Sequence, residues 1–184
     1  NGLELSLFRD NRDFKMNPSK GSALRLKFNR DFGLFNSSNS WTVVDGEFDK
    51  YFSLGESDWF RQRVLAFDFW TAYSPTWNEK SNGDIENGAP SFAGATLGGL
   101  WRLRGYPSQR FSDKAAIYYA AEMRFIPRWN PFDGWPWLQK HLSVQWLQFV
   151  PFVEIGRVAP EWNLKDLHED MKWSAGLGLR LWAA

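Results

Sequence analysis

Arg104, in the stretch Leu97–Tyr106, is the residue of this chain that is best suited to specific polar binding. It follows the glycine pair Gly98-Gly99 and precedes Gly105 and Tyr106. Glycines permit positive φ and close backbone approach, so the stretch predicts a loop that folds back onto another part of the protein. A guanidinium can bond two carboxylates with fixed geometry. The chemistry predicted here is therefore ion pairing with acidic side chains, and Arg104 is not expected to be catalytic.

Other residue types that perform chemistry are sparse or badly spaced. The two histidines, His141 and His168, lack partners at metal-ligand spacing and are expected in interfaces or loops. No cysteine, Gly-x-Ser-x-Gly elbow or P-loop is present. The acidic run Glu161–Asp170 lacks the order of a calcium loop and predicts a solvated loop. We expect no metal, no cofactor and no enzymatic activity.

The composition combines many aromatic residues with many charged ones. Aromatic residues make up 18% of the 184 residues, with 12 Trp and 16 Phe, and charged residues make up 23%. This predicts surfaces that are apolar on one side and hydrated on the other. The net charge of +1 argues against a nucleic-acid partner, which would need phosphate neutralisation. No run of 18 apolar residues occurs, which excludes a transmembrane helix.

Alternation of apolar and polar residues predicts seven strands, because a period of two gives a strand one apolar face. The sharpest case is Leu24–Phe28, where Leu24, Leu26 and Phe28 share one face and two cations share the other. Pro151 predicts a bulge or break within its strand, since proline cannot donate to a ladder. The predicted strands cover residues 3–8, 24–28, 41–52, 63–70, 115–126, 144–158 and the segment from about 171 onward.

The same alternation assigns faces to the acidic residues and separates the strands by loops of unequal length. It places Glu122 opposite to Met123 and Phe125, and Glu154 opposite to Val153 and Ile155. A long aperiodic segment rich in Ser, Asn, Gly and Pro, residues 73–96, leads into the glycine pair. Three tryptophans crowd one turn and predict an interfacial belt, with a partner surface as the alternative: Trp129, Trp135 and Trp137.

Seven such strands with alternating short turns and long loops are typical of an antiparallel transmembrane β-barrel. Strands of this length suit a tilted crossing of the bilayer core. The pattern is weak in any one strand and persuasive only as a set. A soluble β-sandwich is the alternative fold.

The chain resembles the bacterial surface-antigen barrel of the BamA/TamA superfamily, which includes FhaC and patatin-like lipase barrels. The resemblance begins at Gly98–Phe111 and continues in Tyr118–Phe125. The segment Phe152–Gly156, the turn at 17–21 and the closing 176–180 fit the same family. The arginine-glycine-aromatic motif with a downstream aromatic-x-acid-x-glycine strand is its most specific part.

The resemblance implies that the loop at about 73–113 folds into the barrel lumen. It implies that Arg104 contacts acidic groups on the inner walls of the next strands, and here those acids are Glu122 and Glu154. The family commonly has Asp where this chain has Glu154, so the reach is one methylene longer. The functional loop motif is predicted to comprise Gly98, Gly99, Arg104, Gly105 and Tyr106.

The resemblance implies that residues 1–184 form part of one all-β barrel domain, with about seven strands that correspond to the C-terminal half of the family's sixteen-stranded barrel. Unpaired edges are untenable in lipid, so other copies or other parts of the protein must close the barrel. The implied location is the bacterial outer membrane, where the protein assists insertion or translocation of polypeptides. The alternatives are the membrane anchor of a patatin-like lipase and a passive pore. Expected partners are outer-membrane lipid, lipopolysaccharide, client polypeptides and further copies of the chain.

Overall fold

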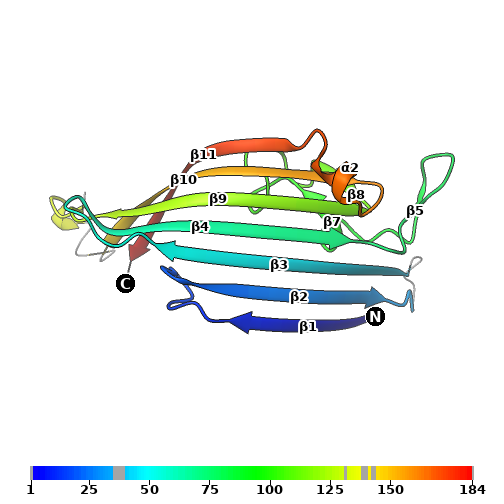
Figure 1. Ribbon diagram of the computed structural model, residues 1–184, viewed down its shortest axis with the longest axis horizontal. Coiled ribbons are helices and arrows are strands. Elements are labelled where there is room, and N and C mark those ends of the chain that lie inside the picture. Colours follow the sequence, from blue (N-terminus) through cyan, green and yellow to red (C-terminus); the bar gives the residue numbers. More distant parts are fainter. Residues whose placement is uncertain (1, 35–39, 131, 138–140, 142–143, 184) are drawn as a thin grey trace.

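Seven long strands form one antiparallel sheet, as the alternation predicts. The computed structural model describes residues 2–34, 40–130, 132–137, 141 and 144–183. The order in the sheet is β1-β2-β3-β4-β9-β10-β11, so each long strand pairs with the next one along the chain (Figure 1). The bounds are β1 (Gly2–Asp10), β2 (Gly21–Asp31), β3 (Trp41–Ser53), β4 (Phe60–Tyr73), β9 (Ala115–Pro127), β10 (Val144–Ala159) and β11 (Lys172–Ala183).

Several strands extend beyond the alternating residues that predict them. Strand β2 was predicted from residues 24–28, yet its ladder with β3 runs from Gly21 opposite Tyr51 to Asp31 opposite Trp41. Polar residues at strand ends contribute backbone pairs that the alternation of side chains does not report. The strands are therefore longer than the alternating residues alone indicate.

Pro151 introduces no bulge into strand β10, but the ladder with β9 is interrupted there, so the expected break is found on that side only. The register with β11 passes through unchanged, from Val150 opposite Gly178 to Pro151 opposite Leu177. The ladder with β9 has no pairs at Val150 and Pro151 but keeps its register on both sides. Proline removes a donor without forcing an extra residue into the strand. The register shift in β10 lies instead near Val144, at the start of the strand.

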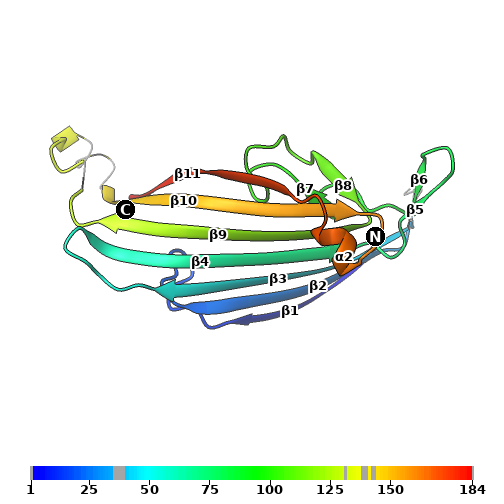
Figure 2. The same ribbon diagram turned by 45° about the horizontal axis from the view of Figure 1, so that its top comes forward.

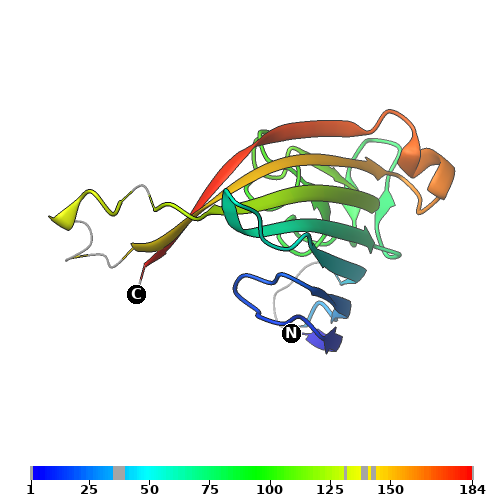
Figure 3. The ribbon, with the colours of Figure 1, turned by 60° about the vertical axis from the view of Figure 1, so that its left-hand side comes forward.

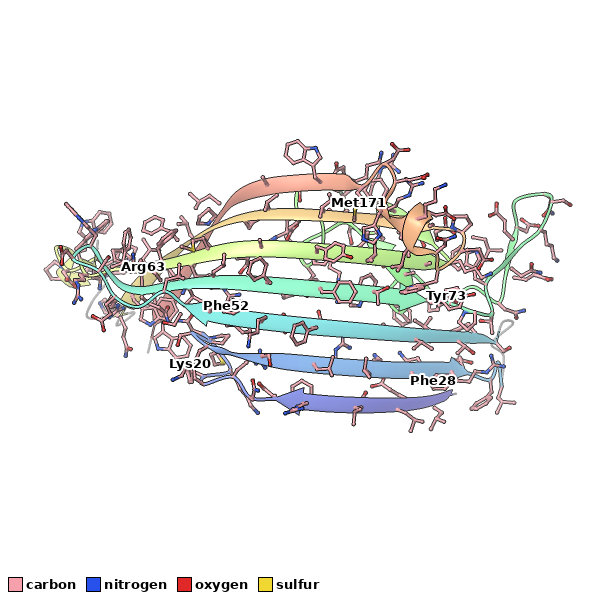
Figure 4. All side chains as sticks on the ribbon, in the orientation of Figure 1. Lys20, Phe28, Phe52, Arg63, Tyr73 and Met171 are labelled. Atoms are coloured by element: carbon pink, nitrogen blue, oxygen red, sulfur yellow. The ribbon has the colours of Figure 1, made fainter. Side chains whose placement is uncertain are left out.

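The two faces of the sheet differ in character. One face, called the outer face here, carries exposed apolar side chains, and on β11 it presents Leu177, Leu179 and Leu181 with exposed fractions of 63%, 62% and 57%. In Figure 4 the outer face is turned toward the viewer, and Phe28, Phe52 and Tyr73 on this face are labelled. The opposite, inner face carries most of the charged residues of the strands. An exposed apolar face of this extent marks a surface that contacts something other than water.

The long loop, residues 74–114, packs against the inner face through its second half, from Ala95 onward, whereas the hairpin at residues 78–86 projects past the end of the sheet (Figure 1). It contains two short hairpins that the sequence did not reveal, β5 (Asn78–Glu79) with β6 (Ile85–Glu86) and β7 (Ala95–Leu97) with β8 (Phe111–Asp113). Leu97 and Leu103 are fully buried in a cluster with Trp70 and Tyr118. The sheet curves around this loop (Figure 3). Apolar packing therefore fixes the loop to β4 and β9.

The connection between β10 and β11 lies on the outer face and is not simply a solvated loop, which corrects another expectation. It contains the short helix α2 (Leu164–His168), whose N-cap Asn163 accepts a hydrogen bond from the backbone N–H of Lys165. Leu167 is fully buried in a cluster with Ile117. Figure 2 shows α2 in front of the strands, on the side away from β7 and β8. Leu167 therefore helps to attach this largely polar segment to the sheet.

The edges of the sheet are strands β1 and β11, neither of which has a second partner strand in the described part of the chain. The tryptophans of the turn after β9 are exposed, with fractions of 56% for Trp129, 63% for Trp135 and 67% for Trp137. None of the helices among the described residues has the length and apolarity to cross a membrane.

Candidate functional site

Arg104 lies between two carboxylates on the inner face of the sheet. Its Nε donates to Glu154 Oε1 at 2.6 Å, and its Nη2 donates to Glu122 Oε1 at 2.9 Å. The backbone N–H of Arg104 also donates to Glu154 Oε2, at 2.6 Å. The structure thus brings together the three residues that the resemblance pairs. One arginine joins the loop to both β9 and β10.

The sheet register explains why these groups converge. Glu154 pairs with Ala120 and Phe152 pairs with Glu122, so the two acids lie diagonally on adjacent strands. A diagonal of this kind, with Cβ atoms about 7–8 Å apart or less, is within reach of one guanidinium. Phe152 lies between them on the same face, and its ring centroid is 3.6 Å from Arg104 Cζ. Arg104 is therefore held by two charges and one aromatic ring.

Glu154 is the most buried member of the cluster. Its side chain is 0% exposed, against 23% for Arg104 and 12% for Glu122. The hydroxyl of Tyr118 donates to Glu154 Oε1 at 2.8 Å, and the hydroxyl of Ser174 donates to Oε2 at 3.2 Å. Buried carboxylates need such partners, because each unpaired lone pair costs desolvation energy. Sequence reasoning missed both hydroxyl donors.

Glu122 receives three arginines. Its Oε2 accepts from Arg124 Nη2 at 2.8 Å and from Arg180 Nη2 at 3.1 Å, in addition to the bond from Arg104 to Oε1. Arg124 shares a strand and a face with Glu122, and Arg180 comes from β11. The cluster therefore spans three strands and the loop. The alternation that identified Glu122 also places Arg124 beside it, and that signal was available in the sequence.

Three glycines shape the loop at Arg104. Gly98, Gly99 and Gly105 have φ angles of 106°, 114° and 97°, a region that L side chains rarely adopt. The N–H of Gly99 donates to the carbonyl of Tyr106 at 3.1 Å, which closes the loop tip. The hydroxyl of Tyr106 donates to the carbonyl of Trp173 at 3.2 Å. The motif thus carries a fold-back turn whose tip reaches β11.

We expect Gly98→Ala to disrupt this turn. An added Cβ would lie 2.4 Å from the carbonyl oxygen of Pro107, in a backbone conformation that already disfavours alanine. The expected cost is about 2 kcal/mol. Limited trypsin digestion should cut the loop of this variant faster than that of the parent protein.

The matched control for this prediction is Gly83→Ala in the same loop. Gly83 also has a positive φ, of 85°, but a Cβ there meets nothing within 4 Å. Equal cleavage of the two variants would show that the close approach at Gly98 does not hold the turn.

A second arginine of the loop, Arg102, makes a separate attachment that sequence reasoning missed. Its Nη2 donates to Glu47 Oε1 at 3.0 Å, and its Cζ lies 4.1 Å from the ring centroid of Trp70. Glu47 also accepts from Arg25, at 2.6 Å. The acids at 45, 47 and 49 alternate along β3, as Arg25 and Lys27 do along β2. This alternation indicates a charged face that could pair with an arginine of the loop. The loop is therefore attached to four strands, with Arg102 bound to β3 and β4 and Arg104 bound to β9 and β10.

Arg102→Ala should cost less than the loss of Arg104. Glu47 would keep Arg25, and the side chains of Arg102 and Glu47 are 24% and 26% exposed. We expect a loss of about 1 kcal/mol, mainly from the cation–π contact and one hydrogen bond. Urea unfolding followed by tryptophan fluorescence measures it. A loss as large as that of Arg104→Ala would contradict the ranking.

The remaining chemical candidates do not assemble into a site. His168 Nε2 lies 2.9 Å from the hydroxyl of Tyr119, and the ring of His141 lies 5.1 Å from that of Trp137. Within the described ranges no group of three acidic, histidine or cysteine side chains could hold a metal. The run Glu161–Asp170 contributes instead to packing on the outer face.

The chain matches the model of a known protein family. The model of the Omp85 superfamily domain matches residues 1–183, which include both the seven-strand sheet and the loop that carries Arg104. A search of curated proteins found no match to the chain. The family match supports the superfamily that the Arg104 motif predicts.

Proposed function

The chain belongs to the Omp85 superfamily, and on that premise we propose that it forms part of a BamA/TamA-type barrel in the bacterial outer membrane. In this role it assists the insertion or translocation of polypeptides. The observation that carries the proposal is the loop held by Arg104 between Glu122 and Glu154 on the inner face of a curved sheet.

The two faces of the sheet suit this role. The apolar outer face would contact lipid, which satisfies its exposed leucines. The inner face, with its ion pairs, would line the lumen and hold the loop. Further strands, from other copies or from the rest of the protein, would pair with the edges β1 and β11, because open edges are not stable in lipid.

The charged cluster on the inner face serves attachment and not bond making in this proposal. Glu122 and Glu154 are occupied by arginine and hydroxyl donors. We therefore assign the chain no enzymatic activity and no cofactor. The partners we propose are outer-membrane lipid, including lipopolysaccharide, and unfolded client polypeptides.

Reconstitution tests the proposed function directly. The protein is placed in liposomes, a urea-unfolded β-barrel client is added, and the heat-modifiable folded form of the client is followed on gels. We expect the client to fold faster than in protein-free liposomes. An unchanged folding rate would contradict the proposal, and steady conductance in the same preparation would then favour a passive pore.

A further inference from the structure

The segment after β10 partly covers a groove on the outer face, at the sheet end where the loop of Arg104 begins. The indole N–H of Trp162 donates to Thr71 Oγ1 at 2.8 Å, which holds the ring over β4. The buried Leu167 fixes α2 beside it on β9. The segment therefore crosses from β10 over β9 to β4. One side of the groove is the Trp162 ring.

The floor of the groove is Gly46, the outer-face residue of β3 at this level. It pairs with Leu26 on one side and with Thr71 on the other. The side chain of Leu26 leans over Gly46, with Cδ2 3.2 Å from where a Cβ of residue 46 would lie, and Leu26 and Val44 border the groove. The groove has a volume of about 570 Å³, within the roughly 300–1,000 Å³ range of small-molecule sites.

One end of the groove is polar and the remainder is apolar. Glu161 lies at the polar end, where its carboxylate accepts from Lys114 Nζ at 2.6 Å and from the hydroxyl of Tyr73 at 3.5 Å. The hydrogen bond to Glu161 raises the pKa of Lys114, so the amine stays protonated. An apolar groove with a charged, hydrogen-bonding end fits an amphipathic molecule that has a polar group at one end and an apolar chain at the other.

We propose that this groove binds an acyl chain of a membrane lipid, with the lipid head group at Lys114 and Glu161. The inference rests on the proposed function, which places the outer face in lipid. The groove is continuous with that face, because Leu26 and Val44 are each 46% exposed. Trp162, 44% exposed and hydrogen bonded, has the amphipathic character of a residue at the membrane interface.

Photo-crosslinking in lipid nanodiscs tests the site. The protein is reconstituted with dimyristoylphosphatidylcholine that contains a minor fraction of phosphatidylcholine with a diazirine in its acyl chain. After irradiation, mass spectrometry maps the modified peptides. We expect the labels to concentrate at Val44 and Trp162, above the level at Leu177 and Leu179 on the open outer face of β11.

Two variants test the groove from opposite sides. Gly46→Phe fills it and Trp162→Ala removes one wall, and each should lower labelling at Val44 about tenfold, the equivalent of roughly 1.4 kcal/mol. Val153→Phe, on the outer face of β10 and 49% exposed, is the matched control and should leave labelling unchanged. Trp162→Ala keeps the test valid if Gly46→Phe does not fold.

The outcomes separate the groove from the proposed function. Equal labelling of the groove and of β11 would overturn the lipid site while leaving the outer face in lipid. Labelling that neither groove variant reduces would overturn it as well. An absence of labels on β11 as well as on the groove would contradict the membrane setting itself.

Discussion

We expect Arg104→Ala to lower the free energy of unfolding by about 3 kcal/mol, the cost of leaving a buried charge without its partner. The charge in question is Glu154, whose side chain is 0% exposed and would keep only neutral donors, the hydroxyls of Tyr118 and Ser174 and the backbone N–H of residue 104. The loop would also lose its bond to Glu122. Urea unfolding in detergent micelles and heat-modifiable gel mobility both measure the loss.

Two further variants make the Arg104 result specific. Arg104→Lys keeps the charge but cannot bond Glu122 and Glu154 with a planar fork, so it should restore only part of the stability. Arg110→Ala removes an exposed arginine of the same loop, whose side chain contacts the ring of Phe111 at 5.4 Å, and should change stability by about 0.5 kcal/mol or less. Wild-type mobility and stability in Arg104→Ala would show that the loop does not depend on this anchor.

Glu122→Gln should also give a large loss, about 2 kcal/mol, because three guanidiniums would then share a site without their common carboxylate. Glutamine keeps the shape of the side chain but removes its charge. Arg124 and Arg180 would face each other and Arg104 with nothing at Glu122 to neutralise them. Since Arg180 is 41% exposed, the loss is smaller than for a fully buried site.

Salt distinguishes this loss from that of Arg104→Ala. Repulsion among partly exposed arginines is screened at about 1 M salt, where the Debye length is near 3 Å. The deficit of Glu122→Gln should therefore shrink as salt is added, whereas that of Arg104→Ala should persist because Glu154 is buried. The control is Glu79→Gln, which removes an exposed acid in the loop that carries Arg104. A deficit that salt does not reduce would contradict repulsion as its cause.

Alternation predicted the parts of the structure that depend on a period of two. It placed Glu122 and Glu154 on one face, and the register of β9 and β10 puts them within reach of one guanidinium. It also identified the seven strands, because the alternation, weak in any one strand, recurs in all of them. The pairing of Arg104 with these two acids came from the family resemblance, and the alternation was consistent with it.

Features that depend on contacts between distant segments were not predictable in this way. The pairing of Arg102 with Glu47 requires knowing that the loop crosses β3, which no local pattern reports. The five residues of α2 are too few to show helical periodicity in the sequence. The bulge expected at Pro151 is absent because the loss of one donor need not shift a register, and only the ladder with β9 is interrupted there.

A disulfide between loop and wall tests the central claim, that the loop tip lies on the inner face of the sheet. The chain has no cysteine, and a Cβ at Gly105 would lie 4.0 Å from Cβ of Ser174, within the roughly 3.5–4.5 Å that a disulfide requires. Gly105→Cys with Ser174→Cys should form a crosslink under mild oxidation that reductant reverses. Gly105→Cys with Leu177→Cys, on the outer face, should form none. Crosslinking of the outer pair, or failure of the inner pair in folded protein, would contradict the inward-folded loop.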